Sequence, residues 1–139
     1  MTALPHVLIV DDDADIRNVL EILLKNKYFV AEAFDGASAI EYVSAHPDID
    51  LIILDVMMPG LSGFETCSRL RELSHAPILF LTAKSAEADR LSAYSSGGDD
   101  FLSKPFSHQE LLAKVNSLLR RYREYRGKND GVISVGDLE

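Results

Sequence analysis

The stretch HVLIVDDD, residues 6–13, joins a nearly continuous aliphatic and aromatic run to three aspartates. Such a run is typical of a parallel β-strand that is covered on both faces. LIIL at residues 51–54 and ILFL at residues 78–81 have the same character. Two weaker runs, residues 29–32 and residues 100–102, are expected to form the edge strands of the same sheet.

Helical patterns alternate with these runs. After the first run, apolar residues recur with the spacing i, i+3, i+4, i+7 and i+8, at Ile16, Val19, Leu20, Leu23 and Leu24. The longest apolar stripe begins at Leu111, and the last helix is predicted to end at Tyr122. The segment 86–96 is rich in serine and has only three apolar positions in a stripe, so the fourth helix should be the least firmly anchored.

Five strand and helix patterns with short connections predict an α/β fold with a parallel sheet and helices on both of its faces. At 139 residues the flavodoxin-like strand order 2-1-3-4-5 is expected, with a ligand site beyond the carboxyl ends of the strands. Residues 1–124 are assigned to this domain. Residues 125–139 are interpreted as a linker, with a turn at residues 128–131.

The composition narrows the functional classes. A net charge of −8 argues against a domain that binds nucleic acid through its own surface. No apolar run approaches the roughly 20 residues of a membrane helix, and no secretory signal is visible, so a cytoplasmic protein without membrane contact is expected. The single cysteine, Cys67, is interpreted as a core residue.

Polar residues follow four of the predicted strands. Three carboxylates meeting at one edge would repel each other by roughly 4 kcal/mol per pair at ~4 Å and an effective dielectric near 20. One lysine does not balance them, so a divalent cation is expected, and Mg2+ fits best because it binds through one or two carboxylates and keeps waters. The residues concerned are Asp11, Asp12, Asp55, Thr82, Ala83 and Lys104.

Each of these residues also has an ordinary explanation when it is taken singly. Aspartates after strands often cap helices, and Asp13 is expected to cap the first helix. A Lys-Pro pair such as Lys104-Pro105 is more often a turn than a site. Their joint occurrence at four strand ends of one sheet is what favours a functional site.

Four motifs carry a resemblance to a known family. They are VDDD at residues 10–13, LDVMMPGLSG at residues 54–63, LTAK at residues 81–84 and GGDDFLSKPF at residues 97–106. In this order and at these separations they resemble the receiver domain of two-component response regulators, over roughly residues 7–122. The resemblance implies the (βα)5 receiver fold and a phosphorylation-controlled switch rather than a classical enzyme.

The resemblance also implies roles for the acidic residues. Asp55 would accept a phosphoryl group from a phosphohistidine on a sensor histidine kinase and form an aspartyl phosphate that hydrolyses slowly. Mg2+ would be held by Asp12, Asp55 and the backbone carbonyl of Met57. Asp11 would act mainly through water and through its charge.

Further roles follow for residues after the fourth and fifth strands. Lys104, the Thr82 hydroxyl and the Ala83 N–H would contact the phosphoryl oxygens, and the bond between Lys104 and Pro105 would be cis. Thr82 and Phe101 would act as switch residues, because phosphorylation would draw Thr82 toward the phosphoryl group and let Phe101 rotate inward. The fourth helix would shift with them.

Charged residues in the last third resemble the OmpR/PhoB family, whose receivers dimerise through the fourth helix, the fifth strand and the fifth helix. This implies a homodimer on activation, although a solvated charged face would look similar. The family usually has arginine where this chain has Lys114, and lysine lacks the bidentate fork. The implied charge pairs are Arg90 with Glu110, Asp100 with Lys114, and Asp99 with Arg121.

The final segment ISVGDLE, residues 133–139, resembles the first strand of the winged-helix DNA-binding domain in that family. Binding to DNA, and with it transcriptional control, is expected only through such a C-terminal domain, which is missing from this sequence.

Three other functions were weighed. A haloacid-dehalogenase-type phosphotransferase needs a second aspartate two residues after the first, and Met57 stands there. A flavin carrier needs a phosphate-binding loop of hydroxyl and glycine residues after the first strand, and that loop is acidic here. A stand-alone receiver that shuttles phosphate or binds a partner protein stays open, and the length of the full gene would distinguish it.

Overall fold

A computed structural model of the chain describes residues 4–83 and 97–136. Strands and helices alternate along it, and the strand HVLIV begins and ends where the sequence predicts. The elements are β1 His6–Val10, α1 Ala14–Leu24, β2 Phe29–Ala33, α2 Gly36–Ala45, β3 Leu51–Asp55, α3 Gly63–Leu70, β4 Ile78–Thr82, β5 Asp100–Ser103 and α5 His108–Gly136. The predicted fourth helix falls on residues outside the described ones.

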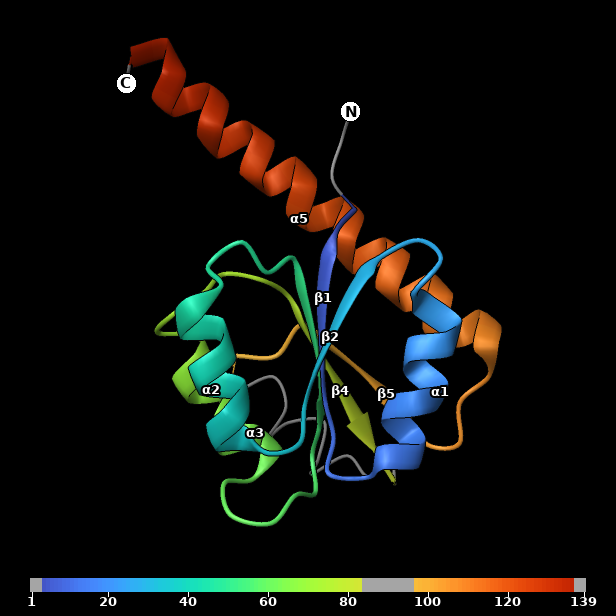
Figure 1. Cartoon of the computed structure of the whole chain (residues 1–139). Helices are drawn as coiled ribbons and strands as arrows, with labels where there is room; N and C mark the ends of the chain where they lie inside the picture. Colours follow the sequence, from blue (N-terminus) through green and yellow to red (C-terminus); the bar gives the residue numbers. More distant parts are fainter. Residues whose placement is uncertain (1–3, 84–96, 137–139) are drawn as a thin grey trace.

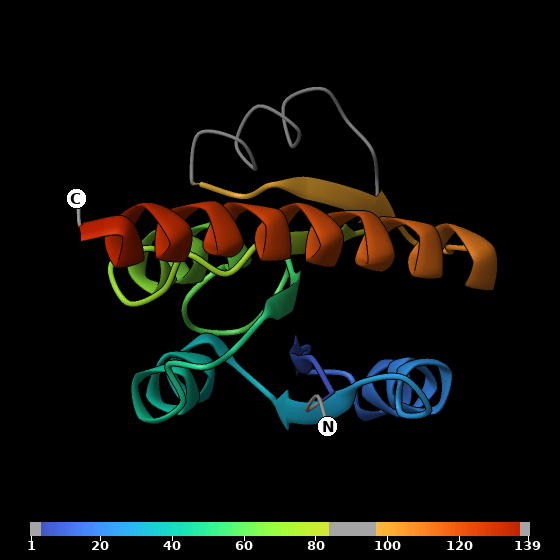
Figure 2. The same cartoon turned by 90° about the horizontal axis from the view of Figure 1, so that it is seen from above.

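The five strands form one parallel sheet in the order β2-β1-β3-β4-β5, which confirms the predicted fold class and strand order. Helices α2 and α3 cover one face of the sheet, and α1 and α5 cover the other (Figure 1). The weak runs are the edge strands β2 and β5, as predicted. Viewed from above, α5 extends along the whole breadth of the domain (Figure 2).

Alternate residues of the inner strands fill two separate apolar layers. Leu8, Ile52 and Phe80 point into the layer under α2 and α3, where Cys67 is fully buried, as the sequence predicts. Ile9 and Ile53 point into the opposite layer, under α1 and α5. Because both faces of β1, β3 and β4 are covered, these strands read as continuous apolar runs.

Four strands end one residue later than the apolar patterns indicate. β3 includes Asp55 and β4 includes Thr82, because the backbone ladder continues past the last apolar side chain. The two polar side chains are therefore fixed by strand geometry and not by a loop. α1 begins where the carboxylate of Asp13 accepts a hydrogen bond from the Asp15 N–H at 2.9 Å, so the predicted helix cap is confirmed.

The end of the last helix differs from the prediction. α5 continues past Tyr122 to Gly136, so the predicted turn at residues 128–131 is wrong, and residues 133–136 are helical where the sequence resembles a strand. A long-range contact stabilises the extension: Arg126 Nη1 lies 2.9 Å from Asp50 Oδ1, and its guanidinium lies over the Tyr122 ring. The division between residues 1–124 and 125–139 stays a prediction, and α5 runs across it.

Candidate functional site

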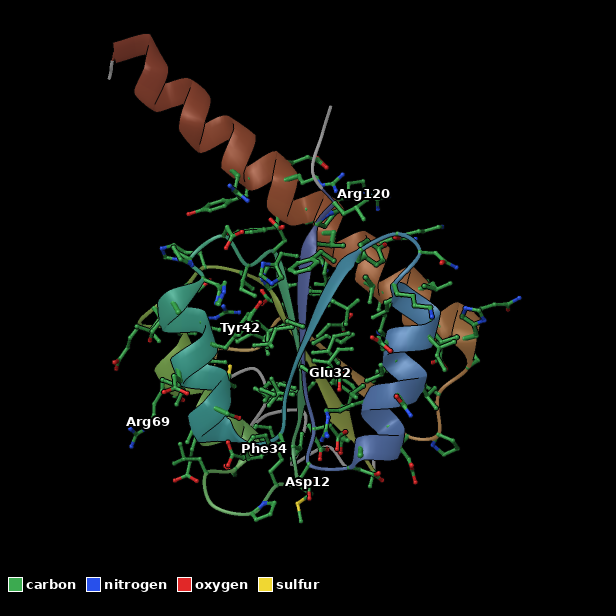
Figure 3. The ribbon with its side chains drawn as sticks, in the orientation of Figure 1. Asp12, Glu32, Phe34, Tyr42, Arg69 and Arg120 are labelled. Carbon is green, nitrogen blue, oxygen red and sulfur yellow. The ribbon has the colours of Figure 1, made fainter. Side chains whose placement is uncertain are left out.

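The carboxyl ends of the strands bring the predicted polar residues together. Asp11, Asp12 and Asp55 each offer a carboxylate oxygen within 4.8 Å of the others. Lys104 Nζ, from the segment after β5, lies 3.2 Å from Asp11 Oδ2 and 3.3 Å from Asp55 Oδ1. Figure 3 shows Asp12 at this edge of the molecule. The predicted convergence of these four side chains is thus confirmed.

The backbone of Asp11 and its carboxylate are fully engaged. Its N–H donates to the Ala33 carbonyl at 3.2 Å, and its own carbonyl accepts from Arg17 Nη1 at 2.7 Å. Its Oδ1 accepts from the Asp13 N–H at 2.9 Å, and its Oδ2 accepts from Lys104. Asp11 is completely buried, and these contacts satisfy the polar groups that burial removes from water.

The surroundings of Asp55 disfavour its ionised form. Only 5% of the residue is exposed, and burial together with the negative charge of Asp11 raises its pKa to about 6. The charge of Lys104 and the Met57 backbone amide act in the opposite direction on that pKa. For Lys104, burial disfavours the ammonium, but the charges of Asp55 and Asp11 outweigh it and raise the pKa of Lys104.

The loop after β3 packs closely under Asp55. The N–H of Gly63 donates to the Val56 carbonyl at 2.9 Å, and a Cβ at Gly63 would lie 2.3 Å from the Asp55 carbonyl oxygen. Only glycine fits there, so α3 can begin directly against the backbone of Asp55. Ser62 and Glu65 form a capping box that fixes this first turn. Met57 is 74% exposed, and its backbone amide forms a hydrogen bond to the Asp55 carboxylate.

The remaining predicted site residues lie beside this cluster. Thr82 is buried at the end of β4, and Ala83 follows it at the surface. The Lys104–Pro105 peptide is cis, as the resemblance implied, and the Lys104 N–H donates to the Thr82 carbonyl at 2.6 Å. Phe101 is half-buried in β5, where it pairs in register with Phe80.

Three of the predicted interface residues, Asp99, Asp100 and Lys114, already form ion pairs within the chain. Lys114 Nζ lies 3.1 Å from Asp100 Oδ2, and Asp99 Oδ2 accepts from Arg71 Nη2 at 2.5 Å. Glu110 belongs to the first turn of α5, and Arg121 is exposed beside Asp99 in a shallow pocket. Arg90 lies outside the described residues.

Sequence reasoning missed two arginines. Arg17 joins α1 to the Asp11 carbonyl and to Glu32 of β2. Arg71 donates to the Gly97 carbonyl at 2.7 Å, in addition to Asp99. Neither contact has a signal in spacing or composition, because each depends on backbone acceptors brought near by the folded chain.

The chain belongs to the response regulator receiver domain family, whose sequence profile matches residues 7–116. It is therefore the receiver domain of a two-component response regulator, a phosphoacceptor and not a classical enzyme, and this family implies a cognate histidine kinase. The three carboxylates form the acidic triad that is typical of the Mg2+ site in receivers. Within residues 4–83 and 97–136, no helix has the length and apolar character that a membrane crossing requires.

Among curated proteins, the chain is 47% identical over 126 residues to the uncharacterized transcriptional regulatory protein YrkP of Bacillus subtilis, covering 90% of this chain and 54% of the relative. It is 40% identical over 131 residues to the regulatory protein VanR of Enterococcus faecium, with 91% and 56% covered. The chain thus spans about half the length of these relatives. Among solved structures, the chemotaxis protein CheY4 of Vibrio cholerae superposes with a TM-score of 0.78 at 32% identity, covering 84% of this chain and 99% of that one.

The raised pKa of Asp55 generates a stability prediction. The native state holds the Asp55 proton more tightly than the unfolded chain does, so stability should fall as pH rises from about 4 to about 6. In metal-free buffer at pH 7.5, Asp55→Asn should therefore be more stable by about 1–2 kcal/mol, a value reduced for the loss of the Lys104 contact and for solvent screening. Below pH 4 the gain should disappear.

Urea unfolding at several pH values measures this difference. Glu41→Gln removes one exposed carboxylate from α2 and is the matched control, for which no such pH dependence is expected. An Asp55→Asn variant that is no more stable than the wild-type protein at pH 7.5 would contradict the conclusion that the ionised Asp55 carboxylate destabilises the native state.

Proposed function

We propose that Asp55 accepts a phosphoryl group from a phosphohistidine of a sensor histidine kinase, and that the chain is the switch domain of a transcriptional regulator. The observation that carries this proposal is the position of Asp55. Its carboxylate is buried at the end of β3, 3.3 Å from an ammonium group and within 4.8 Å of two further carboxylates. This arrangement concentrates positive charge, from Lys104 and a bound cation, where a phosphoryl group would sit.

The donor set suits Mg2+, because all of its side-chain donors are hard carboxylate oxygens. Asp12 is exposed and forms no hydrogen bond to other described residues, so it is available as a ligand, as are Asp55 and the Met57 carbonyl. Asp11 already binds Lys104 and the Asp13 N–H, which supports a role through water and charge. When bound, Mg2+ would neutralise charge on the transferred phosphoryl group.

In the transfer, an oxygen of Asp55 attacks phosphorus, the P–N bond to the imidazole breaks, and its electron pair returns to the ring nitrogen. Lys104 then contacts the phosphoryl oxygens, together with the Thr82 hydroxyl and the Ala83 N–H. Water later attacks the aspartyl phosphate, releases phosphate and restores the carboxylate. A cytoplasmic location, where a sensor histidine kinase would supply the phosphoryl group, belongs to the same proposal.

The switch would connect the phosphoryl group to β5. Thr82 and Ser103 pair in register, and Phe101 lies two residues before Ser103. A shift of Thr82 would therefore move the edge strand β5 directly. Moving an equilibrium from 1:99 to 99:1 needs ~5.5 kcal/mol. A charge-assisted hydrogen bond contributes about 1.5–3 kcal/mol, so Thr82, Ala83, Lys104 and the cation must act together.

The output would be a homodimer that presents a DNA-binding domain. The relative YrkP is named as a transcriptional regulatory protein and VanR as a regulatory protein, and the match to this chain covers 54% and 56% of their lengths. The charge of −8 supports DNA contact through a further C-terminal domain and not through the receiver surface. In the single chain, Asp100 and Lys114 form an internal pair, so the proposed dimer requires them to exchange this contact for one across the two-fold axis.

The acceptor assignment predicts that Asp55→Asn abolishes phosphorylation. Incubation with phosphoramidate and Mg2+ should add one phosphoryl group to the wild-type protein and none to the variant, because an amide oxygen is a poor nucleophile. Intact-protein mass spectrometry measures the addition. Asp50→Asn, at the opposite end of β3, is the matched control and should be labelled normally. Labelling of Asp55→Asn at the wild-type level would overturn the assignment.

The metal assignment predicts that Asp12→Ala weakens Mg2+ binding at least tenfold while the fold is kept, because a direct ligand is removed. Calorimetric titration measures the affinity, and far-ultraviolet circular dichroism measures the fold. Asp15→Ala, on the first turn of α1, removes an exposed carboxylate that is not a ligand and should bind Mg2+ like the wild-type protein. Equal affinities for Asp12→Ala and the wild-type protein would exclude Asp12 as a ligand.

The interface assignment predicts that beryllofluoride with Mg2+, which mimics the phosphoryl group on Asp55, shifts the protein from monomer toward dimer. Asp100→Lys should prevent the shift, and the double change Asp100→Lys with Lys114→Asp should restore part of it. Sedimentation velocity at low and high salt measures the dimer, which should weaken as salt rises. Asp48→Lys, a charge reversal away from this surface, is the control. A dimer that Asp100→Lys leaves intact would contradict the interface.

A further inference from the structure

Arg17 of α1 reaches across to the acidic loop after β1. Its Nη1 donates to the backbone carbonyl of Asp11 at 2.7 Å, and its Nε donates to Glu32 Oε1 of β2 at 3.1 Å. The Arg17 side chain is partly buried, with 19% exposed, whereas Glu32 is more open to solvent, with 35% of its side chain exposed. Figure 3 labels Glu32 on β2 and Asp12 at the carboxyl edge of the sheet.

Together with two backbone contacts, these hydrogen bonds hold the backbone at the start of the loop after β1, a set of contacts called the frame below. The Asp11 N–H is bound by the Ala33 carbonyl at the end of β2, and the Asp13 N–H is bound by Asp11 Oδ1. The Asp11 carbonyl belongs to the peptide that leads into Asp12, and Arg17 is the group that holds it. Among the described residues, no hydrogen bond holds the Asp12 side chain itself. The direction of the Asp12 carboxylate therefore depends on the orientation of this peptide.

We propose that Arg17 is a positioning residue for the metal site: it fixes the Asp11–Asp12 peptide so that the Asp12 carboxylate points toward Asp55, and Glu32 orients its guanidinium. This inference rests on the proposed role of Asp12 as a metal ligand. It assigns to Arg17 the work that second-shell partners do at other metal sites, where their loss lowers metal affinity about 10–100-fold.

Two simpler explanations make opposite or different predictions. If Arg17 acted only by its positive charge, its removal would strengthen the binding of a cation to the nearby carboxylates. If Arg17 only joined α1 to β2, its removal would lower the stability of the protein without a selective effect on metal affinity. A positioning role instead predicts weaker Mg2+ binding even though a positive charge has been removed.

Arg17→Met should lower Mg2+ affinity about tenfold, as measured by calorimetric titration of the full chain. Glu32→Gln should lower it less, because the amide oxygen of glutamine still accepts from the guanidinium and only the charge of this acceptor is lost. Arg17→Lys should fall between the wild-type protein and Arg17→Met, since an ammonium group reaches the carbonyl but lacks the planar fork. The matched control is Arg69→Met, the same substitution at an exposed position of α3.

Amide exchange in metal-free buffer gives a second readout. The Asp11 and Asp13 N–H groups, which donate to the Ala33 carbonyl and to Asp11 Oδ1, should exchange several-fold faster in Arg17→Met, while amides in β3 and β4 should keep their wild-type rates. Such a local effect would separate a loosened loop from a general loss of stability, and Glu32→Gln tests the same frame if Arg17→Met does not fold.

The outcomes are distinct. Unchanged or tighter Mg2+ binding in both Arg17→Met and Glu32→Gln would overturn the positioning role, while the acceptor and ligand assignments would stand. Faster exchange throughout the protein with unchanged affinity would also overturn it. If the wild-type protein does not bind Mg2+, the metal site fails, and the role of Arg17 fails with it.

Discussion

Two buried carboxylates, those of Asp11 and Asp55, share one ammonium group at the carboxyl edge of the sheet. In water these charges would separate, but strand geometry holds them together, since β1 leads into Asp11 and β3 includes Asp55. The surrounding contacts can be understood from this constraint. Lys104 approaches both carboxylates, the Asp13 N–H binds Asp11, and the glycine at position 63 lets α3 begin directly against the Asp55 backbone.

This arrangement lowers the stability of the folded protein and favours the binding of a cation at the same site. Burial next to a like charge raises the pKa of Asp55 to about 6, so at neutral pH the protein holds an ionised carboxylate that its surroundings disfavour. The two apolar layers, which bury the strands on both faces, offset the unfavourable free energy of this carboxylate. A cation, or a phosphoryl group with its cation, would relieve the repulsion, and the relieved free energy would favour its binding.

Much of the fold and the site was predictable because the signals are local. Continuous apolar runs reveal buried parallel strands, and parallel strands necessarily bring Asp12, Asp55, Thr82 and Lys104 to one edge. The missed features depend on contacts distant in sequence. Nothing near Tyr122 indicates that Asp50 will bind Arg126 and extend α5, and nothing near Arg17 indicates that its acceptors will be a backbone carbonyl and Glu32. Such partners become visible only once the strand order places them side by side.

The contact between Arg126 and Asp50 lies at the amino edge of the sheet, whereas Asp55 lies at the carboxyl edge of the same strand. Five strand residues separate the two edges by roughly 16 Å, about two screening lengths at physiological ionic strength. Charge added at Asp55 would therefore be strongly screened by the solvent at the part of α5 that leaves the domain (Figure 1). If Asp55 is the phosphoacceptor, an effect of phosphorylation would have to reach that end of the helix as a displacement of packed atoms, and α5, which lies against the sheet before it projects away, would be the element that carries it.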